Sequence, residues 1–257
     1  RSREWAQRCM QELQLHDSAA YVTLTYSDDN LPPDGSLLKS DLQKFFKRLR
    51  KHYGKVRHYS CGEYGERYGR PHYHSIIYGL RIPDKKYYKH HNGNPLYKST
   101  WLEEIWQKGQ VTIGAVSFES CAYVARYIMK KVNGKNQYFH YADVDKSTGE
   151  VLSERIPEFT TMSRKPGIGA DWYEKYQGDI YNSAHEGVCY VRGGIATKPA
   201  RYYDEKQFLQ NPDKMNRIKE RRKEKASVKA KTMTPQILNS IKSHMEGQIG
   251  MLPRNQH

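Results

Sequence analysis

Several features that define other protein classes are missing from this sequence. It has only four cysteines, and no two of them form a C-x-x-C pair, so we expect reduced, intracellular thiols rather than a disulfide framework or a zinc finger. No apolar run approaches the roughly 18 residues that a membrane-spanning helix needs, and no signal peptide is recognisable. The absence of G-x-x-x-x-G-K-[ST] and other nucleotide fingerprints argues against an ATP-driven motor.

Acidic residues are also in short supply. The chain of 257 residues has 43 lysines and arginines against 28 aspartates and glutamates, a net charge of +15, and it contains 21 tyrosines. Cations bind phosphates and aromatic rings stack on unpaired bases, so this composition favours a nucleic-acid partner. Charge alone does not exclude a protein that is merely basic.

The hydrophobic pattern predicts a mixed α and β chain. A helix-like segment already surrounds Arg1, so we expect the natural N-terminus to lie further upstream. We predict a helix over residues 36–54, capped by Ser36 or Ser40, and a hairpin formed by residues 55–65 and 71–79. Residues 83–99 are interpreted as a loop-like insertion. The remaining elements expected are strands at 21–26 and 111–117, helices at 101–109, 118–131 and 171–180, and hairpins at 136–156 and 188–199.

The stretch GRPHYHSIIYGL contains two histidines, His72 and His74, one residue apart at the start of an apolar strand. Strand side chains alternate between faces, so both imidazoles point the same way. Such a pair alone is a weak signal, because cupins, amidohydrolases and ordinary packed strands contain one. Glu63 lies across the expected hairpin and can complete a set of two nitrogens and one oxygen with open positions. We expect one divalent ion, Mg²⁺ or Mn²⁺, although Zn²⁺, Co²⁺ or Ni²⁺ can bind such ligands more tightly.

Other assignments of this pattern are weaker. Glu66 competes as the carboxylate, but it belongs to a glycine-rich loop that fixes it less well. A cupin needs a further glutamate soon after the histidines, and SIIYGL has none. His90 and His91 fall in the insertion, where we expect them to be solvated. Two ordinary, satisfied histidines remain the simplest alternative to a metal site.

The second candidate site is the helical stretch AYVARYIMKK. Tyr123 and Tyr127 are four residues apart and therefore share one helix face, with Lys130 and Lys131 one turn further on. Tyrosines at this spacing are usually packing residues, yet phenols flanked by cations suit a purely apolar interface poorly. A tyrosine near a metal and cations can attack a phosphodiester and form a covalent phosphotyrosine, so rejoining needs no ATP.

Taken together, CGEYGERYGRPHYHSIIYG, SFESCAYVARYIMKK, EFTTMSRKPGIG and PARYYD resemble the HUH endonucleases, and most closely the replication initiators of gokushoviruses, small phages of the Microviridae. The resemblance runs from about residue 21 to residue 203 and implies an α+β fold with a central antiparallel sheet. It implies that Glu63, His72 and His74 hold Mg²⁺ or Mn²⁺, that Tyr123 and Tyr127 are the nucleophiles, and that Lys130 assists them. The implied partners are origin DNA and a host helicase and polymerase, in the bacterial cytoplasm.

These observations predict a sheet of about five strands. Residues 1–200 are expected to form the nicking and joining domain, and residues 201–257 a basic, helical extension. The implied function is origin nicking through a 5′-phosphotyrosine, to start and end rolling-circle replication. Two alternatives remain: a plasmid initiator, relaxase or transposase with the same chemistry, and a single-strand-binding module without catalysis.

Overall fold

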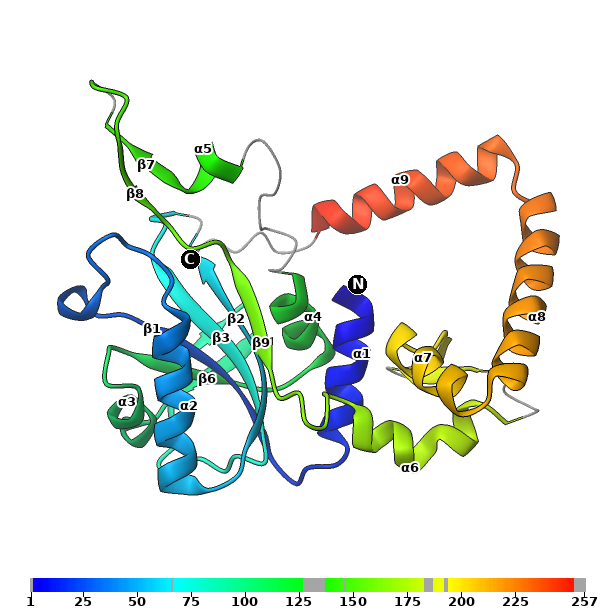
Figure 1. Cartoon of the computed structure of the whole chain (residues 1–257), viewed down its shortest axis with the longest axis horizontal. Coiled ribbons are helices and arrows are strands. Elements are labelled where there is room, and N and C mark those ends of the chain that lie inside the picture. Colours follow the sequence, from blue (N-terminus) through cyan, green and yellow to red (C-terminus); the bar gives the residue numbers. More distant parts are fainter. Residues whose placement is uncertain are drawn as a thin grey trace. The chain divides into compact units, whose positions relative to one another are not determined.

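The computed structural model describes residues 2–65, 67–126, 137–145, 147–182, 187–191 and 194–251. They form two compact units, Arg1–Lys175 and Tyr176–His257. The first unit is built on an antiparallel sheet, so the predicted α+β class is confirmed (Figure 1). No helix in the described part of the chain is both long and apolar enough to cross a membrane.

The sheet has seven strands, two more than the sequence suggested. In spatial order they are β4 (Lys86–His91), β5 (Asn94–Lys98), β6 (Val111–Gly114), β1 (Ala19–Thr25), β3 (Pro71–Tyr78), β2 (Arg57–Tyr64) and β9 (Phe159–Met162). Strands β2 and β3 form the predicted hairpin, and β3 lies inside the sheet between β1 and β2.

Helices cover both faces of this sheet. Apolar residues of α2 (Lys39–Tyr53) and α3 (Thr100–Trp106) pack on one face, in a core that includes Val22 and Leu24 of β1. Residues of α1 (Ser2–Leu13) and α4 (Phe118–Arg126) pack on the other face. The alternating burial of β1 follows from this arrangement, since one set of its side chains faces each layer.

Two local predictions were wrong. Helix α2 starts at Lys39 with Leu38 at its N-cap, and no side chain caps it. Ser36 instead accepts a hydrogen bond from the backbone N–H of Ile156, so a tertiary contact takes the hydroxyl that local sequence assigned to the cap. The insertion at residues 83–99 is not a loop, because β4 and β5 pair there as an edge hairpin.

The remaining elements of the first unit follow α4 in the chain. A short helix α5 (Gln137–Tyr141), which the sequence did not predict, precedes the expected hairpin of β7 (Ala142–Val144) and β8 (Val151–Glu154). Helix α6 (Ala170–Ile180) matches its prediction and runs across the boundary between the units.

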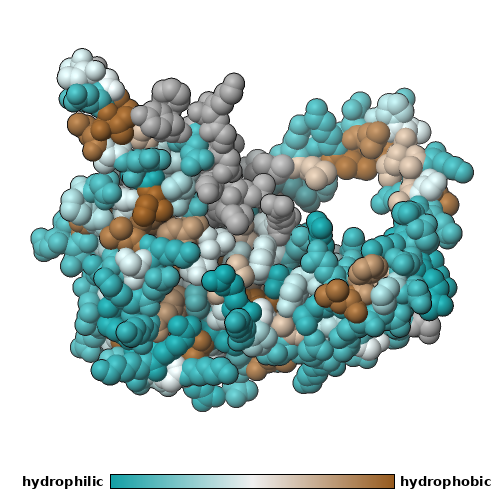
Figure 2. All heavy atoms as spheres, viewed as in Figure 1, coloured by the Kyte–Doolittle hydropathy of each residue, from teal (hydrophilic) through white to brown (hydrophobic). Residues whose placement is uncertain are grey.

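The second unit contains the predicted hairpin and a helical C-terminal segment. Its elements are β10 (Cys189–Val191), β11 (Ile195–Thr197), α7 (Arg201–Gln210), α8 (Pro212–Lys231) and α9 (Pro235–Met251). Arg222 of α8 donates to the Asp204 carboxylate of α7 and ties these two helices together. Hydrophobic side chains gather on α9, as Figure 2 shows. The predicted domain boundary at residue 200 concerns function and stays a prediction.

Candidate metal centre and tyrosine

The register of the β2–β3 hairpin places the three candidate ligands on one face. Glu63 lies directly opposite His72, and Cys61 lies opposite His74. Side chains of opposed residues in an antiparallel pair point to the same side, as do residues two apart on one strand. The glutamate and both histidines therefore converge, because the sequence alternates through this hairpin without a bulge.

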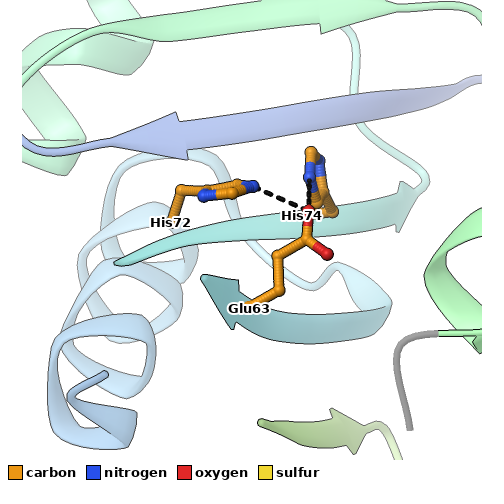
Figure 3. Close-up of side chains that lie close together, drawn as sticks. All are labelled: Glu63, His72 and His74. Atoms are coloured by element: carbon orange, nitrogen blue, oxygen red, sulfur yellow. Dashed lines mark hydrogen bonds and ion pairs between the residues drawn. The ribbon is translucent and has the colours of Figure 1, made fainter. Parts of the chain in front are cut away.

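The three side chains meet at one carboxylate oxygen (Figure 3). Glu63 Oε1 lies 2.7 Å from Nε2 of His72 and 2.9 Å from Nε2 of His74. The two imidazole rings are nearly perpendicular, at 89°, with their centroids 4.9 Å apart. Glu63 and His74 are buried, whereas 14% of the His72 side chain is exposed. The set is thus reachable from solvent on the His72 side.

Both histidines are held from behind by their second ring nitrogen. His72 Nδ1 lies 3.1 Å from the backbone carbonyl of Arg70, which can only accept, so this nitrogen carries a proton. His74 Nδ1 lies 2.8 Å from the Tyr21 hydroxyl and 2.9 Å from the Thr23 hydroxyl. Such partners fix ring orientation in metal sites and leave Nε2 as the ligand atom.

Glu63 remains ionised in this environment. Burial acts to raise the pKa of its carboxyl, but hydrogen bonds from His72 and His74 outweigh it and hold the pKa at about 2. The second oxygen, Oε2, is buried and has no hydrogen-bond partner. A buried carboxylate oxygen without a partner is costly, and a cation would satisfy it. Two imidazole nitrogens and a carboxylate within 4.8 Å of one another therefore fit a divalent metal ion.

Helix α4 brings a tyrosine to the same place. The Tyr123 hydroxyl lies 3.3 Å from Glu63 Oε1, and its ring contacts His74 edge-on with centroids 5.1 Å apart. Cys121, Val124 and Ala125 bury the inner side of α4 in the core, which sets the position of the phenol. The other predicted residues of this helix, Tyr127, Lys130 and Lys131, lie outside the described residues, as does Glu66.

Sequence reasoning missed Tyr21 and Thr23 as partners of the site. The signal was present, because YVTLTY alternates polar and apolar residues and so places Tyr21, Thr23 and Thr25 on one face. Their role depends on pairing between β1 and β3, where Thr23 lies opposite His74. Nothing local in the sequence fixes that register.

Comparison with known proteins identifies relatives among phage proteins. A model of a family of replication-associated proteins, described by its member ORF2, matches residues 19–132. Replication-associated protein VP4 of Bdellovibrio phage phiMH2K is 30% identical over 83% of this chain and 65% of its own length. Replication-associated protein ORF2 of Spiroplasma virus 4 is 28% identical over 88% of the chain and 70% of its own length.

A third relative, replication-associated protein ORF4 of Chlamydia phage 1, is 33% identical over 68% of the chain and 43% of its own length. The chain therefore spans only part of each of these relatives, and less than two thirds of the first and third. No solved structure matches the chain.

Proposed function

Because residues 19–132 of this chain match the ORF2 family of replication-associated proteins, we propose that the chain nicks and rejoins origin DNA to start and end rolling-circle replication of a small phage genome. The observation that carries the proposal is the contact between a tyrosine hydroxyl and a buried Glu–His–His set on one sheet face. A structural metal site gives no reason for a phenol beside it.

The ligands proposed for the ion are Glu63, His72 and His74, and the ion proposed is Mg²⁺ or Mn²⁺. When bound, it would polarise the scissile phosphodiester and stabilise negative charge on the phosphate oxygens. Nitrogen ligands also admit softer divalent ions, so the choice among metals rests on the need to hold a substrate oxygen in an open position.

Tyr123 is proposed as a nucleophile. Its phenol oxygen attacks the phosphorus, the bond from phosphorus to the 3′ oxygen breaks, and the 5′ phosphate remains on the tyrosine. The phenol proton passes to solvent, and the departing 3′ oxygen takes one up to become the hydroxyl that primes synthesis. Attack by a 3′ hydroxyl on the phosphotyrosine reverses these steps and rejoins the strand. Tyr127 is proposed as the second nucleophile and Lys130 as a cation near the developing phenolate.

The proposed partner is single-stranded DNA at the origin, with a host helicase to separate strands and a host polymerase to extend the primer. Replication of a phage genome by host enzymes would take place in the cytoplasm of the bacterial host. The same chemistry would serve a plasmid initiator, a relaxase or a transposase, but the matched relatives are phage replication-associated proteins.

The decisive test is incubation of the protein with labelled single-stranded oligonucleotides tiling the origin region of its genome, with Mn²⁺ or EDTA, followed by a denaturing gel. We expect a covalent adduct in Mn²⁺ alone. Tyr123→Phe and Tyr127→Phe should each retain some adduct, and the double variant should lose it. Glu63→Gln and His74→Ala should lose both the adduct and Mn²⁺ binding measured by calorimetry.

His90→Ala is the matched control, because His90 is an exposed histidine on β4 outside the ligand set. It should leave adduct formation and Mn²⁺ binding unchanged. Tight DNA binding without any adduct across oligonucleotides that tile the whole genome would refute the enzymatic proposal and favour a single-strand-binding module.

A further inference from the structure

The edge hairpin β4–β5 has a surface of unusual composition. Residues 85–98 contain four lysines, three tyrosines and two histidines and have no aspartate or glutamate. Tyr87 and Tyr88 expose 59% and 43% of their surface. Lysines on an edge strand commonly prevent pairing with another sheet, but that role leaves exposed aromatic rings unexplained.

Cations and rings are arranged together on this hairpin. Lys98 Nζ lies 4.3 Å from the centroid of the Tyr88 ring, and Lys89 Nζ lies 5.4 Å from it. The hairpin turns at Asn92 and Gly93, both with positive φ, which is the conformation of the tight two-residue turn. A short turn gives a fixed strand pair, so Tyr88 is presented to solvent without a flexible loop.

The strand register connects this hairpin to the metal ligands. His74 lies opposite Thr23, and Thr23 lies opposite Thr112 of β6. Tyr97 pairs with Ile113, so Lys98, the next residue of β5, lies beside Thr112, and Lys86 lies opposite Lys98. With strands about 4.8 Å apart, Lys98 is about 14 Å from His74 across the sheet.

Residues in one such row point to one face of the sheet. Thr23, Thr112 and Lys98 are each partly exposed, so the row between the ligand set and the hairpin is polar and reachable from solvent. It begins at His74 with hydroxyl groups and ends at the edge with ammonium groups. This is a path along which a chain of phosphates can lie.

We propose that the β4–β5 hairpin binds single-stranded DNA next to the scissile phosphate, with Tyr88 stacking on an unpaired base and Lys86, Lys89 and Lys98 contacting phosphates. The proposal rests on the proposed function, since it assigns a binding surface for that substrate. Unpaired bases are required because only they offer a free face to the tyrosine.

The test measures binding separately from chemistry. A fluorescein-labelled oligothymidylate of about 20 nucleotides is titrated in EDTA and followed by anisotropy, since stacking platforms tolerate any base. Tyr88→Ala should weaken binding about 5- to 100-fold. The triple variant Lys86→Gln, Lys89→Gln, Lys98→Gln should lower the slope of log affinity against log salt by about 2, because each phosphate that a lysine neutralises adds about 0.7 to that slope.

The matched control removes the same charge from the opposite face of the sheet. Exposed lysines of α2 serve for this, in the triple variant Lys44→Gln, Lys47→Gln, Lys51→Gln. Its salt slope should stay near that of the unmodified protein. Tyr88→Ala should also leave the affinity for a duplex of the same length unchanged, because paired bases offer no free face.

Equal affinity of the hairpin variants and the unmodified protein for the oligothymidylate would overturn the proposal. Adduct formation on origin DNA distinguishes this failure from failure of the proposed function. An adduct without any hairpin effect refutes the binding surface alone. Weakened binding by the hairpin variants, without an adduct in the unmodified protein, refutes the nicking chemistry and leaves the binding surface in place.

Discussion

The ring of His74 is oriented by two hydroxyl groups, those of Tyr21 and Thr23, each within hydrogen-bond distance of Nδ1. Burial raises the pKa of Tyr21 well above 10, so its phenol stays neutral and can accept a proton from the imidazole. Loss of both hydroxyls in Tyr21→Phe, Thr23→Val should weaken Mn²⁺ binding about 10- to 100-fold, as loss of such partners does elsewhere.

Calorimetric titration with Mn²⁺ checks this prediction. Each single variant should have a smaller effect, because the other hydroxyl remains on Nδ1. Thr25→Val is the control, since the Thr25 hydroxyl bonds the Gln110 carbonyl and not a ligand. Unchanged Mn²⁺ affinity in the double variant would mean that the ring needs neither hydroxyl for its orientation.

Single residues show where sequence reasoning succeeds and where it stops. The convergence of Glu63, His72 and His74 was predictable, because a hairpin joins neighbouring segments and fixes their register. The hydroxyls behind His74 were not, because β1 and β3 are separated in the chain by helix α2 and strand β2. Contact with Tyr123 was inferred from the family resemblance, and helix spacing alone does not bring α4 to this face.

A second histidine should make stability depend on pH. His58 is buried against Phe46, with ring centroids 3.8 Å apart. Burial lowers the pKa of His58 to about 3, helped by the positive charges of Arg50 and Arg57. The unfolded chain binds this proton near the ordinary pKa of 6.5, so stability contributed by neutral His58 is present above pH 6.5 and is lost as the pH falls toward 3.

Urea unfolding at two pH values tests this. Between about pH 7 and pH 4.5, His58 should account for about 2–3 kcal/mol of the loss in unfolding free energy. His58→Asn cannot titrate and keeps a polar atom near the Ser60 hydroxyl, which bonds Nδ1 in the native protein. Its unfolding free energy should fall less between these pH values, whatever its absolute stability. An equal fall in both proteins would contradict the assignment.

Among the secondary-structure elements, helix α1 is attached to the sheet by one buried carboxylate. Glu12 accepts from Arg57 of β2 and from the backbone N–H of Gly169. Burial acts to raise its pKa, but the Arg57, Gly169 and His16 hydrogen bonds outweigh it and hold the pKa below the ordinary value. Glu12→Gln leaves Arg57 without its charge partner and should lower the unfolding free energy by about 3 kcal/mol.

Denaturant unfolding at neutral pH measures this loss. Glu4→Gln, in the first turn of the same helix, removes the same charge and should change the unfolding free energy by less than about 0.5 kcal/mol. A comparable loss in both variants would point to a general helix effect and not to the bond between α1 and β2.

The elements differ in how far the sequence specified them. Helix α2 was predictable because Leu42, Phe45, Phe46 and Leu49 recur at helical spacing and Gly54 ends it. The β4–β5 hairpin was missed because β4 is exposed along nearly its whole length and has no apolar alternation. The Asn92–Gly93 pair was the overlooked signal, since such a pair favours a two-residue hairpin turn.

For the whole molecule, the resemblance to phage replication proteins is confirmed by the relatives. The positive charge is concentrated in particular elements, and helix α8 has nine basic residues against three acidic ones. The predicted helical C-terminal segment is therefore also basic. A charged, exposed helix of this kind contacts phosphates without reading bases.

The contribution of α8 to DNA binding should be electrostatic and independent of the edge hairpin. Arg217, Lys229 and Lys231 are exposed on α8. If each contacts one phosphate, replacing all three by glutamine should lower the salt slope for single-stranded DNA by about 2. The same loss should occur with duplex DNA of equal length, because phosphate contacts do not require unpaired bases.

Anisotropy titrations over a range of salt concentrations, in EDTA, check this prediction. Combination with the Lys86, Lys89 and Lys98 changes tests independence, since separate contacts give additive losses of free energy. A combined variant that loses no more than the hairpin variant alone would mean that the two surfaces compete for the same stretch of DNA. An unchanged slope in the α8 variant would mean that the net charge of +15 acts on DNA through the first unit alone.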